Sequence, residues 1–318
     1  MADVTDAAFR RLIAKYGKPD VTWTEFVSAD GLALAPEEGK KKLLLDLKYS
    51  ESERPIVAQF FPSSPEPMRQ AAACAQQLGF DGIDINMGCP VKKVLNQNSC
   101  SALIKTPELA KEIILAAKSG AGNLPVSVKT RIGFNKIEIE SWISNLLEAE
   151  PAVLIVHLRT VKEMSKVPAH WEVMKRIVEI RNELNKKTLI IGNGDVMSLE
   201  EGRQKVKETG CDGVMFGRAI FGNPWLFGRG ERSGLENFKR PDLKERLEVL
   251  IEHTKLFEEL IGEVKNFAIM KKHFKAYVNG FDGAADLRAK LMEAEKAEEV
   301  EQILKEFLER FVDMTRHL

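Results

Sequence analysis

Apolar residues along the chain alternate between short continuous runs and longer stretches with helical spacing. Runs rich in β-branched residues predict strands at 21–29, 55–61, 82–88, 125–133, 152–160, 188–195 and 213–221. Several of these runs are almost continuously apolar, which is typical of strands covered on both faces. The stretches between them have the spacing of amphipathic helices, and two of them begin with Ser or Thr and end on Gly, as capped helices do. This alternation predicts an α/β protein with a parallel sheet.

Seven strands in this order favour a (β/α)8 TIM barrel, which closes with eight. Residues 1–17 indicate a loop followed by a helix, so the first strand of the barrel is expected to be missing from this chain. We assign residues 1–228 to the barrel. A doubly wound open sheet is the structural alternative.

The pattern changes after residue 228, where strand signals stop. "DLKERLEVLIEHTKLFEELIG", "VKNFAIMKKHFKAYVNG" and "EEVEQILKEFLERFVDM" have the spacing of amphipathic helices. We therefore predict a C-terminal all-α helical domain over residues 241–318, joined to the barrel by the linker "RGERSGLENFKRP".

Composition excludes several classes of protein. The 318 residues are 44% hydrophobic and 30% charged, with 47 basic and 47 acidic residues, as in an ordinary globular protein. No apolar run is long enough to cross a bilayer, and the start lacks the apolar segment of a secretory signal. The four cysteines have no C-x-x-C spacing, which argues against a structural zinc site. A cytoplasmic protein without a bound metal is expected.

Polar residues collect near the ends of the predicted strands. In a (β/α)8 barrel all carboxyl ends of strands lie on one face, and that face carries the active site. Side chains from distant parts of the sequence should therefore meet at one mouth. They are Gln59, Cys89, Lys129, His157, Arg159, Asn193, Gly194, Asp195, Gly217 and Arg218.

The last two strand ends predict a site for phosphate. Barrels often hold phosphate with the loops after their last two strands, and here these loops carry "GNGD" and "GRAIFGNP". Glycines let backbone N–H groups approach an anion, and Arg218 could clamp it.

Each of these residues also has an ordinary structural interpretation. A cysteine at a strand end, such as Cys89, is more often a packing residue than a reactive one. Lys129 could lie on the surface and His157 could be a buried histidine with its hydrogen bonds satisfied. Asp195 could cap the next helix, although Ser198 is the better cap. Cys74 and Cys211 are expected in the core.

Five motifs together resemble those of the tRNA-dihydrouridine synthases. They are "MADVTD", "DINMGCP", "VKTRIG", "IIGNGD" and "GVMFGRAIFGNPW", in this order and spacing, and they span residues 1 to about 228. The helical segment "MKKHFKAYVNGFDGAADLR" is also similar. The sequence differs from the family pattern in lacking the first strand, in Leu158 after the histidine, and in "NQNSCSALI", which brings a second thiol at Cys100.

The resemblance implies an FMN-dependent enzyme that uses NADPH to reduce the C5–C6 double bond of particular uridines in tRNA. Cys89 would be the catalytic residue, and Asn86 and Arg159 would bind the substrate. The flavin would be held by Met1, Ala2, Gln59, Lys129, His157, Asn193, Gly194, Asp195, Gly217 and Arg218.

The chemistry agrees with these residue types. Flavin N5 can supply hydride to C6, and a thiol with an ordinary pKa of ~8.5 is protonated at neutral pH and can supply the proton to C5. A stacked base must be flipped out to reach such a pocket. Phosphate contacts are expected from the helical domain. The candidates are Lys265, Lys271, Lys272, His273 and Lys275, for which a solvated helix face is the alternative.

Three other functions stay open from the sequence. The first is a flavin enzyme of the same fold that reduces a free pyrimidine or an enone. The second is an aldolase or lyase that uses Lys129 as a Schiff-base amine. The third is a catalytically impaired tRNA-binding protein. We expect a monomer without a protein partner.

Overall fold

A seven-stranded parallel sheet is the centre of the protein. The structure is a computed structural model that describes residues 1, 3–228 and 241–316, with side chains described to residue 310. The predicted strands are confirmed, although the last one ends six residues earlier than expected. They are β1 (Thr22–Ser28), β2 (Ile56–Phe61), β3 (Gly82–Met87), β4 (Val126–Arg131), β5 (Val153–His157), β6 (Leu189–Asn193) and β7 (Gly213–Met215).

The strands lie in the order β1-β2-β3-β4-β5-β6-β7, and every neighbouring pair is parallel. This singly wound order is that of a (β/α) barrel and rules out the doubly wound alternative, whose strand order reverses direction. Among the described residues no ladder joins β7 to β1. The sheet therefore has one strand fewer than a closed eight-stranded barrel, as predicted.

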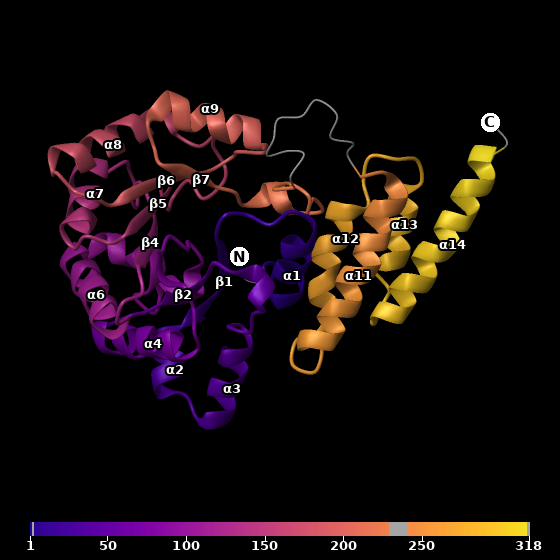
Figure 1. Ribbon diagram of the computed structural model, residues 1–318, viewed down its shortest axis with the longest axis horizontal. Helices are drawn as coiled ribbons and strands as arrows, with labels where there is room; N and C mark the ends of the chain where they lie inside the picture. Colours follow the sequence, from indigo (N-terminus) through magenta and orange to yellow (C-terminus); the bar gives the residue numbers. More distant parts are fainter. Residues whose placement is uncertain (2, 229–240, 317–318) are drawn as a thin grey trace. The chain divides into compact units, whose positions relative to one another are not determined.

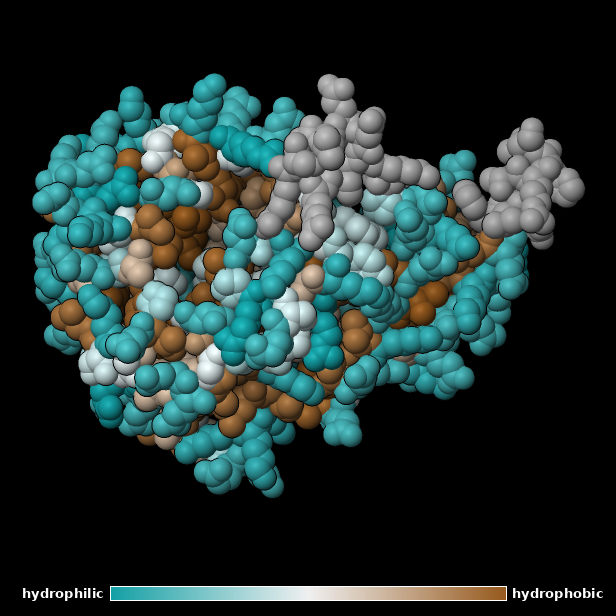
Figure 2. Space-filling view, in the orientation of Figure 1, coloured by the Kyte–Doolittle hydropathy of each residue, from teal (hydrophilic) through white to brown (hydrophobic). Residues whose placement is uncertain are grey.

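Helices follow most of the strands and cover the outside of the sheet. Figure 1 shows α4 and α6 to α9 around the outer side of an arc of strands, and Figure 2 shows hydrophilic residues over these helices with hydrophobic ones gathered further in. Ser198 caps α9 by accepting a hydrogen bond from Glu201 N, as expected. The helices between strands are α2 (Ala29–Leu34), α3 (Glu37–Leu45), α4 (Pro65–Gln77), α5 (Lys92–Leu95), α6 (Pro107–Gly120), α7 (Ile139–Glu148), α8 (Met174–Glu183) and α9 (Leu199–Thr209).

Contacts divide the chain into two compact units. The sheet unit comprises Asp20–Leu47 and Arg54–Ala219, and the helical unit comprises Met1–Pro19, Lys48–Glu53 and Ile220–Leu318. The N-terminal segment, assigned above to the barrel, groups with the C-terminal helices by contact. The predicted linker at residues 229–241 falls almost wholly outside the described residues.

The helical unit contains the three predicted helical stretches. A capping box between Asp242 and Glu245 starts the longest of its described helices, so its beginning is encoded locally. The helices are α1 (Ala7–Tyr16), α11 (Leu243–Ile261), α12 (Lys271–Tyr277), α13 (Ala284–Leu291) and α14 (Ala297–Arg316).

Hydrogen bonds explain why the N-terminal helix belongs to this unit. The hydroxyl of Tyr16, at the end of α1, donates to the carboxylate of Glu252 on α11 at 2.6 Å. Arg10 is buried, and its Nε donates to Glu53 Oε2 at 2.8 Å while its other nitrogens reach the carbonyls of Thr5 and Lys48. A buried arginine without such partners would destabilise the fold, so residues 48–53 are tied to α1.

Candidate active site

Strand register brings several predicted site residues together at the carboxyl ends of β3 to β6. Asn86 on β3 pairs with Lys129 on β4. His157 on β5 lies between Arg131 on β4 and Asn193 on β6. The expected convergence of strand ends is confirmed for these residues. What each of them does remains a prediction.

A chain of buried polar side chains crosses the sheet below this end. Gln59 Nε2 donates to Asp84 Oδ2 at 2.7 Å, and Ser127 Oγ donates to the other oxygen of the same carboxylate. Asn86 Nδ2 donates to Gln59 Oε1 at 3.2 Å. Burial raises the pKa of Asp84 above its usual range, although both hydrogen bonds and Lys129 oppose the shift. These hydrogen bonds fix the side-chain amides of Gln59 and Asn86 in one orientation.

Lys129 is one of the cationic groups of this site. Burial, partly offset by the charge of Asp84, lowers the pKa of the ammonium to about 8. Its Nζ donates to Asn193 Oδ1 at 3.2 Å, and no other acceptor within the described residues has a hydrogen bond with it. An ammonium group has three donors, so Lys129 keeps capacity for a ligand. Asn193 is held in turn by the carbonyl of Met215 at 2.8 Å.

Cys89 lies in the turn directly after β3, and the neighbouring residues hold its backbone. Asn86 Oδ1 accepts hydrogen bonds from the amides of Gly88 at 3.0 Å and Cys89 at 3.1 Å. Arg131 Nε donates to the Gly88 carbonyl at 2.8 Å. Asn86 therefore has both its oxygen and its nitrogen engaged internally, and it shapes the turn that presents the thiol.

The pKa of Cys89 differs from expectation. The neighbouring side chain of Cys100 lowers it most, with help from the Val91 backbone and the charges of Arg131 and Lys129, although burial opposes the shift. These surroundings favour the thiolate of Cys89 more than those of the ordinary thiol assumed from the sequence. Sequence reasoning missed the cause, because it treated Cys89 as an isolated group.

Arg131 is a site residue that the sequence analysis overlooked. It is 6% exposed and, besides Gly88, it donates to the carbonyls of Thr160 and Met164, both at 3.0 Å. It thus connects the turn of Cys89 with the loop after β5. A signal was present in "VKTR", where strand alternation places Lys129 and Arg131 on the same face.

His157 and Arg159 form a second cluster with Asp195. Arg159 is 3% exposed, its Nη1 lies 3.2 Å from His157 Nε2, and its Nη2 forms an ion pair with Asp195. Its Nε donates to the Val167 carbonyl at 2.6 Å. Burial, followed by the charges of Lys129 and two arginines, lowers the pKa of His157 far below its usual range, so the ring is neutral. The guanidinium of Arg159 has internal partners on every nitrogen, and its substrate role stays a prediction.

The loops after β6 and β7 place the guanidinium of Arg218 near the unfilled space at Gly217. Arg218 Nη2 donates to Asp195 Oδ1 at 2.7 Å, and its side chain is 63% exposed. A side chain added at Gly217 would meet no atom within 4 Å. Gly194 has a φ of +133°, and a Cβ there would lie 2.8 Å from that of Ala169, so this position requires glycine. These groups fit the phosphate of a nucleotide cofactor, since they offer an accessible guanidinium beside unfilled space.

Two residues of the predicted flavin site, Met1 and Ala2, come from the start of the chain. Ala2 is outside the described residues. Met1 groups with the helical unit, and its terminal amine donates to Thr5 Oγ1 at 2.7 Å. Their predicted flavin contacts remain predictions.

The lysines of α12 and its histidine differ in their exposure to solvent. Lys272 and Lys275 are exposed, and Lys271 is half-buried. His273 is 0% exposed and stacks against Phe221 at 5.5 Å between ring centroids. The expectation that His273 contacts phosphate is therefore wrong. Residues 272 and 275 share the solvent side of the helix, whereas 273 faces the interior.

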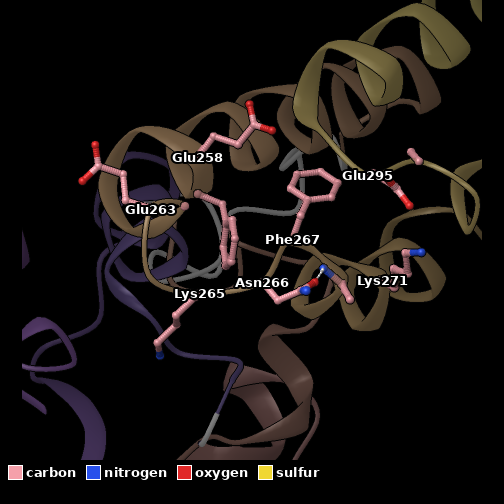
Figure 3. A pocket seen from close by; sticks show the side chains of 11 residues that line it. Glu258, Glu263, Lys265, Asn266, Phe267, Lys271 and Glu295 are labelled. Atoms are coloured by element: carbon pink, nitrogen blue, oxygen red, sulfur yellow. Dashed lines mark hydrogen bonds between the residues drawn. The ribbon is translucent and has the colours of Figure 1, made fainter. Parts of the chain in front are cut away.

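A cavity of about 650 Å³ lies in the helical unit, near the ends of α11 and the start of α12. Figure 3 shows the ring of Phe267 pointing into it, with Lys265 turned away. Lys271 and Asn266 contribute polar groups to its lining. All of its lining residues belong to the helical unit, and none of them is a strand-end residue predicted from the sequence.

Comparison with known proteins identifies the family. The family model described as dihydrouridine synthase (Dus) matches residues 1–313. The chain belongs to the dihydrouridine synthase family. It is 40% identical over 309 residues, 96% of this chain and 91% of the relative, to a probable tRNA-dihydrouridine synthase of Staphylococcus aureus (strain COL). It is 39% identical over 315 residues, 98% of this chain and 94% of the relative, to probable tRNA-dihydrouridine synthase 2 of Bacillus subtilis (strain 168).

Solved structures agree with this fold for a dihydrouridine synthase. Histamine dehydrogenase from Rhizobium sp. 4-9 superposes with a TM-score of 0.53 at 13% identity, covering 79% of this chain and 46% of that one. This chain therefore spans less than half of that dehydrogenase, and the likeness concerns the fold alone.

The described residues of this dihydrouridine synthase lack two other features. They include no group of three or more His, Cys, Asp or Glu side chains that could hold a metal ion. None of their helices combines the length and the apolar composition needed to cross a bilayer.

Proposed function

We propose that the protein is a tRNA-dihydrouridine synthase that reduces the C5–C6 double bond of specific uridines in tRNA with FMN and NADPH. The family and the names of its relatives support the reaction. The observation that carries the proposal is the placement of Cys89 beside two cations at the strand ends, half-buried Lys129 and buried Arg131. A thiol next to two cations suits a reaction that takes up hydride and a proton.

FMN is the cofactor that the site fits. Bound flavin would accept hydride from NADPH and return it to C6 of the uracil. Arg218 and the open space at Gly217 would receive the phosphate, with Gly194 keeping the neighbouring loop close. Lys129 would hold the ring system with its free donors, and its positive charge favours negative charge developing on the ring.

The protein supplies the proton. In its protonated form the Cys89 thiol transfers a proton to C5 and becomes a thiolate, which Arg131 and Lys129 stabilise. Asn86 keeps the thiol in position through the two turn amides. A bound base would exclude water from the thiol and thereby raise its pKa, which favours the protonated form. The neutral ring of His157 adds no further charge beside Lys129.

The substrate is proposed to be tRNA with the target uridine flipped out of its stack. Exposed lysines of the helical unit, Lys272 and Lys275 with half-buried Lys271, would contact phosphates. We further propose that the protein acts as a monomer in the cytoplasm.

Cys89→Ala and Cys89→Ser test the proposal. Genes for these variants are returned to cells that lack the protein, and dihydrouridine in tRNA is mapped by mass spectrometry. Loss of general acid catalysis should lower the rate of dihydrouridine formation by about 10²-fold or more. Reduction of the bound flavin by NADPH should persist, since it needs no proton from Cys89. Cys74→Ala, which removes a half-buried thiol from α4, is the matched control.

Three results would contradict the proposal. Unchanged dihydrouridine in cells lacking the gene would remove tRNA as the substrate, and a wild-type rate in Cys89→Ala would remove the thiol as the acid. Purified protein that never shows flavin absorbance would remove the cofactor.

Reversing the charge of exposed lysines on α12 distinguishes modification of tRNA from reduction of a free pyrimidine or enone. Lys272→Glu with Lys275→Glu should abolish tRNA modification but leave small-molecule reduction intact. Deletion of residues 241–318 is less suitable, because α1 packs on α11 through Tyr16 and would lose its partner.

A further inference from the structure

Asp84 is a buried carboxylate near the candidate site, and the proposed reaction gives it no role. It lies in the middle of β3 and is 0% exposed. Each of its oxygens accepts a hydrogen bond from a neighbouring strand. Gln59 Nε2 on β2 donates to Oδ2 at 2.7 Å, and Ser127 Oγ on β4 donates to Oδ1. Asp84 precedes Asn86 by two residues, so both side chains lie on the same face of the strand.

The carboxylate of Asp84 fixes the direction of the hydrogen bonds that follow it. A carboxylate has no donor, so the Gln59 amide turns its Nε2 toward Asp84 and its oxygen the other way. That oxygen accepts from Asn86 Nδ2 at 3.2 Å. Asn86 Oδ1 is thereby left facing the amides of Gly88 and Cys89, which donate to it at 3.0 and 3.1 Å. The orientation set at Asp84 is therefore passed on to the turn that carries the thiol.

The opposite orientation would place donors against donors. If the amide of Asn86 were reversed, its Nδ2 would face the two backbone N–H groups of the turn, and neither of them would have an acceptor. Gln59 and Asn86 are only 6% and 7% exposed, so solvent has little access to replace the lost hydrogen bonds. Unpaired buried donors are costly. The acceptor at Asp84 therefore decides whether the turn of Cys89 is held.

We propose that Asp84 is a positioning residue for Cys89. Its carboxylate orients the amide of Gln59, which orients the amide of Asn86. The oxygen of Asn86 then holds the turn that places the thiol. Asp84 takes no part in the proton transfer, because it acts through two other side chains. For its role in catalysis, this inference rests on the proposed function.

Hydrogen exchange at single amides of the full-length protein tests this series of hydrogen bonds without tRNA. Asp84→Ala and Asp84→Val both remove the acceptor, and valine fills most of the space that alanine leaves empty. In both variants the amides of Gly88 and Cys89 should exchange about tenfold faster, which corresponds to the loss of roughly one net hydrogen bond. The amide of Ile83, which donates to the Pro125 carbonyl at 3.0 Å, should keep its protection. General unfolding of β3 would instead expose all three amides.

Two variants separate the acceptor from its charge and from its other partner. Asp84→Asn loses the charge but can still present an oxygen to Gln59. Its Nδ2 would donate to Ser127 Oγ, which lies 3.2 Å from the Ile83 carbonyl and can donate there. Ser127→Ala removes the hydrogen bond to the other oxygen of Asp84. Both variants should keep the two turn amides protected, and a loss in either equal to that in Asp84→Val would overturn the proposal.

A double substitution tests whether Asp84 acts through Gln59. Gln59→Leu breaks the series one step closer to the turn, so it should expose the same two amides. Asp84→Val combined with Gln59→Leu should then be no worse than Gln59→Leu alone. Additive losses would overturn the proposal. The double variant removes both partners of a buried hydrogen bond, so it leaves neither unpaired and remains informative if a single variant fails to fold. Turn amides that stay protected in it would also overturn the proposal.

Steady-state kinetics connect the turn to catalysis. A misplacement of about 1 Å can lower a rate by about 10²-fold, so kcat for tRNA modification should fall by about 10- to 100-fold in Asp84→Val. KM for tRNA should change little, because the thiol acts in the transition state. Asp84→Asn should keep most of the activity. An unchanged kcat in a variant with exposed turn amides would overturn the catalytic role. If the wild type does not modify tRNA but the exchange differences are present, the proposed function fails and the positioning of the turn stands.

Discussion

The buried amides and carboxylate near the strand ends and the two buried histidines of the helical unit are accommodated in opposite ways. In the sheet unit Gln59, Asp84 and Asn86 are linked by hydrogen bonds that fix each amide and carboxylate. In the helical unit His253 and His273 lie 4.5 Å apart between ring centroids, and no hydrogen-bond partner among the described residues reaches their ring nitrogens. The first arrangement keeps polar groups oriented for a ligand. The second uses histidine rings as aromatic packing groups.

The difference shows what buried polarity is for in each unit. A satisfied network stabilises one geometry and holds charge where chemistry needs it. Unsatisfied imidazoles lower stability, and burial lowers the pKa of both rings. We infer that the sheet unit is built around the strand ends, while the helical unit has a core sensitive to acid.

The largest expected loss of stability comes from removing the hydrogen bonds of Arg131. Arg131→Met leaves the carbonyls of Gly88, Thr160 and Met164 without their donor. Unpaired buried carbonyls should lower the free energy of unfolding by about 3 kcal/mol or more. Urea denaturation measures the loss. Arg176→Met, which removes surface ion pairs only, is the control and should have little effect. Equal losses for both variants would contradict the contrast.

The next effect concerns acid stability of the helical unit. Unfolded histidine binds a proton near pH 6.5, but folded His273 binds one only near pH 4, because burial lowers its pKa. Between these values the unfolded chain holds more protons, so stability falls as pH falls, by about 3 kcal/mol in total for this group. His273→Phe should remove much of that loss.

Hydrogen exchange resolves this prediction to individual helices. Amides of α11 and α12 should lose protection between pH 6.5 and 4 in the wild type and less so in His273→Phe. His170→Gln is a control from the sheet unit, since hydrogen bonding with Glu163 raises the pKa of His170 and its stabilisation is lost as pH rises instead. If His273→Phe loses as much amide protection in acid as the wild type, the buried pair of histidines is not the source of the loss.

The smallest effect on stability is expected at Lys272. Its Nζ forms an exposed ion pair with Asp3 at 3.0 Å, which should contribute less than about 1 kcal/mol. Lys272→Ala should nevertheless weaken tRNA binding and reduce the slope of log affinity against log salt by about 0.7 to 0.9. Filter binding over a range of salt concentrations measures the slope. An unchanged slope would mean that Lys272 does not contact tRNA phosphate. It would then belong to a solvated helix face, which is the alternative given in the sequence analysis.

Much of the fold could be predicted because its signals are local. All seven strands were located, since apolar runs and capping residues such as Ser198 lie next to each other in the chain. The site was predicted in part: Asn86, Lys129, His157 and Asn193 do meet across strands. Arg131 and Asp84 were overlooked because their partners are distant in sequence, and His273 was misjudged because charge composition alone does not distinguish the sides of a helix.

The sequence by itself determined three features. These are the alternation of strands and helices that makes a parallel sheet, the helical nature of the C-terminal region, and the placement of a thiol where β3 ends. These follow from periodicity and turn chemistry within a few residues. Only the tertiary structure decided that α1 groups with the C-terminal helices and that Cys100 and Arg131 reach the turn of Cys89. It also decided that the surroundings of Cys89 lower its pKa. The physical reason is that hydrogen bonding and electrostatics depend on distances in space, which residues far apart in the chain acquire only on folding.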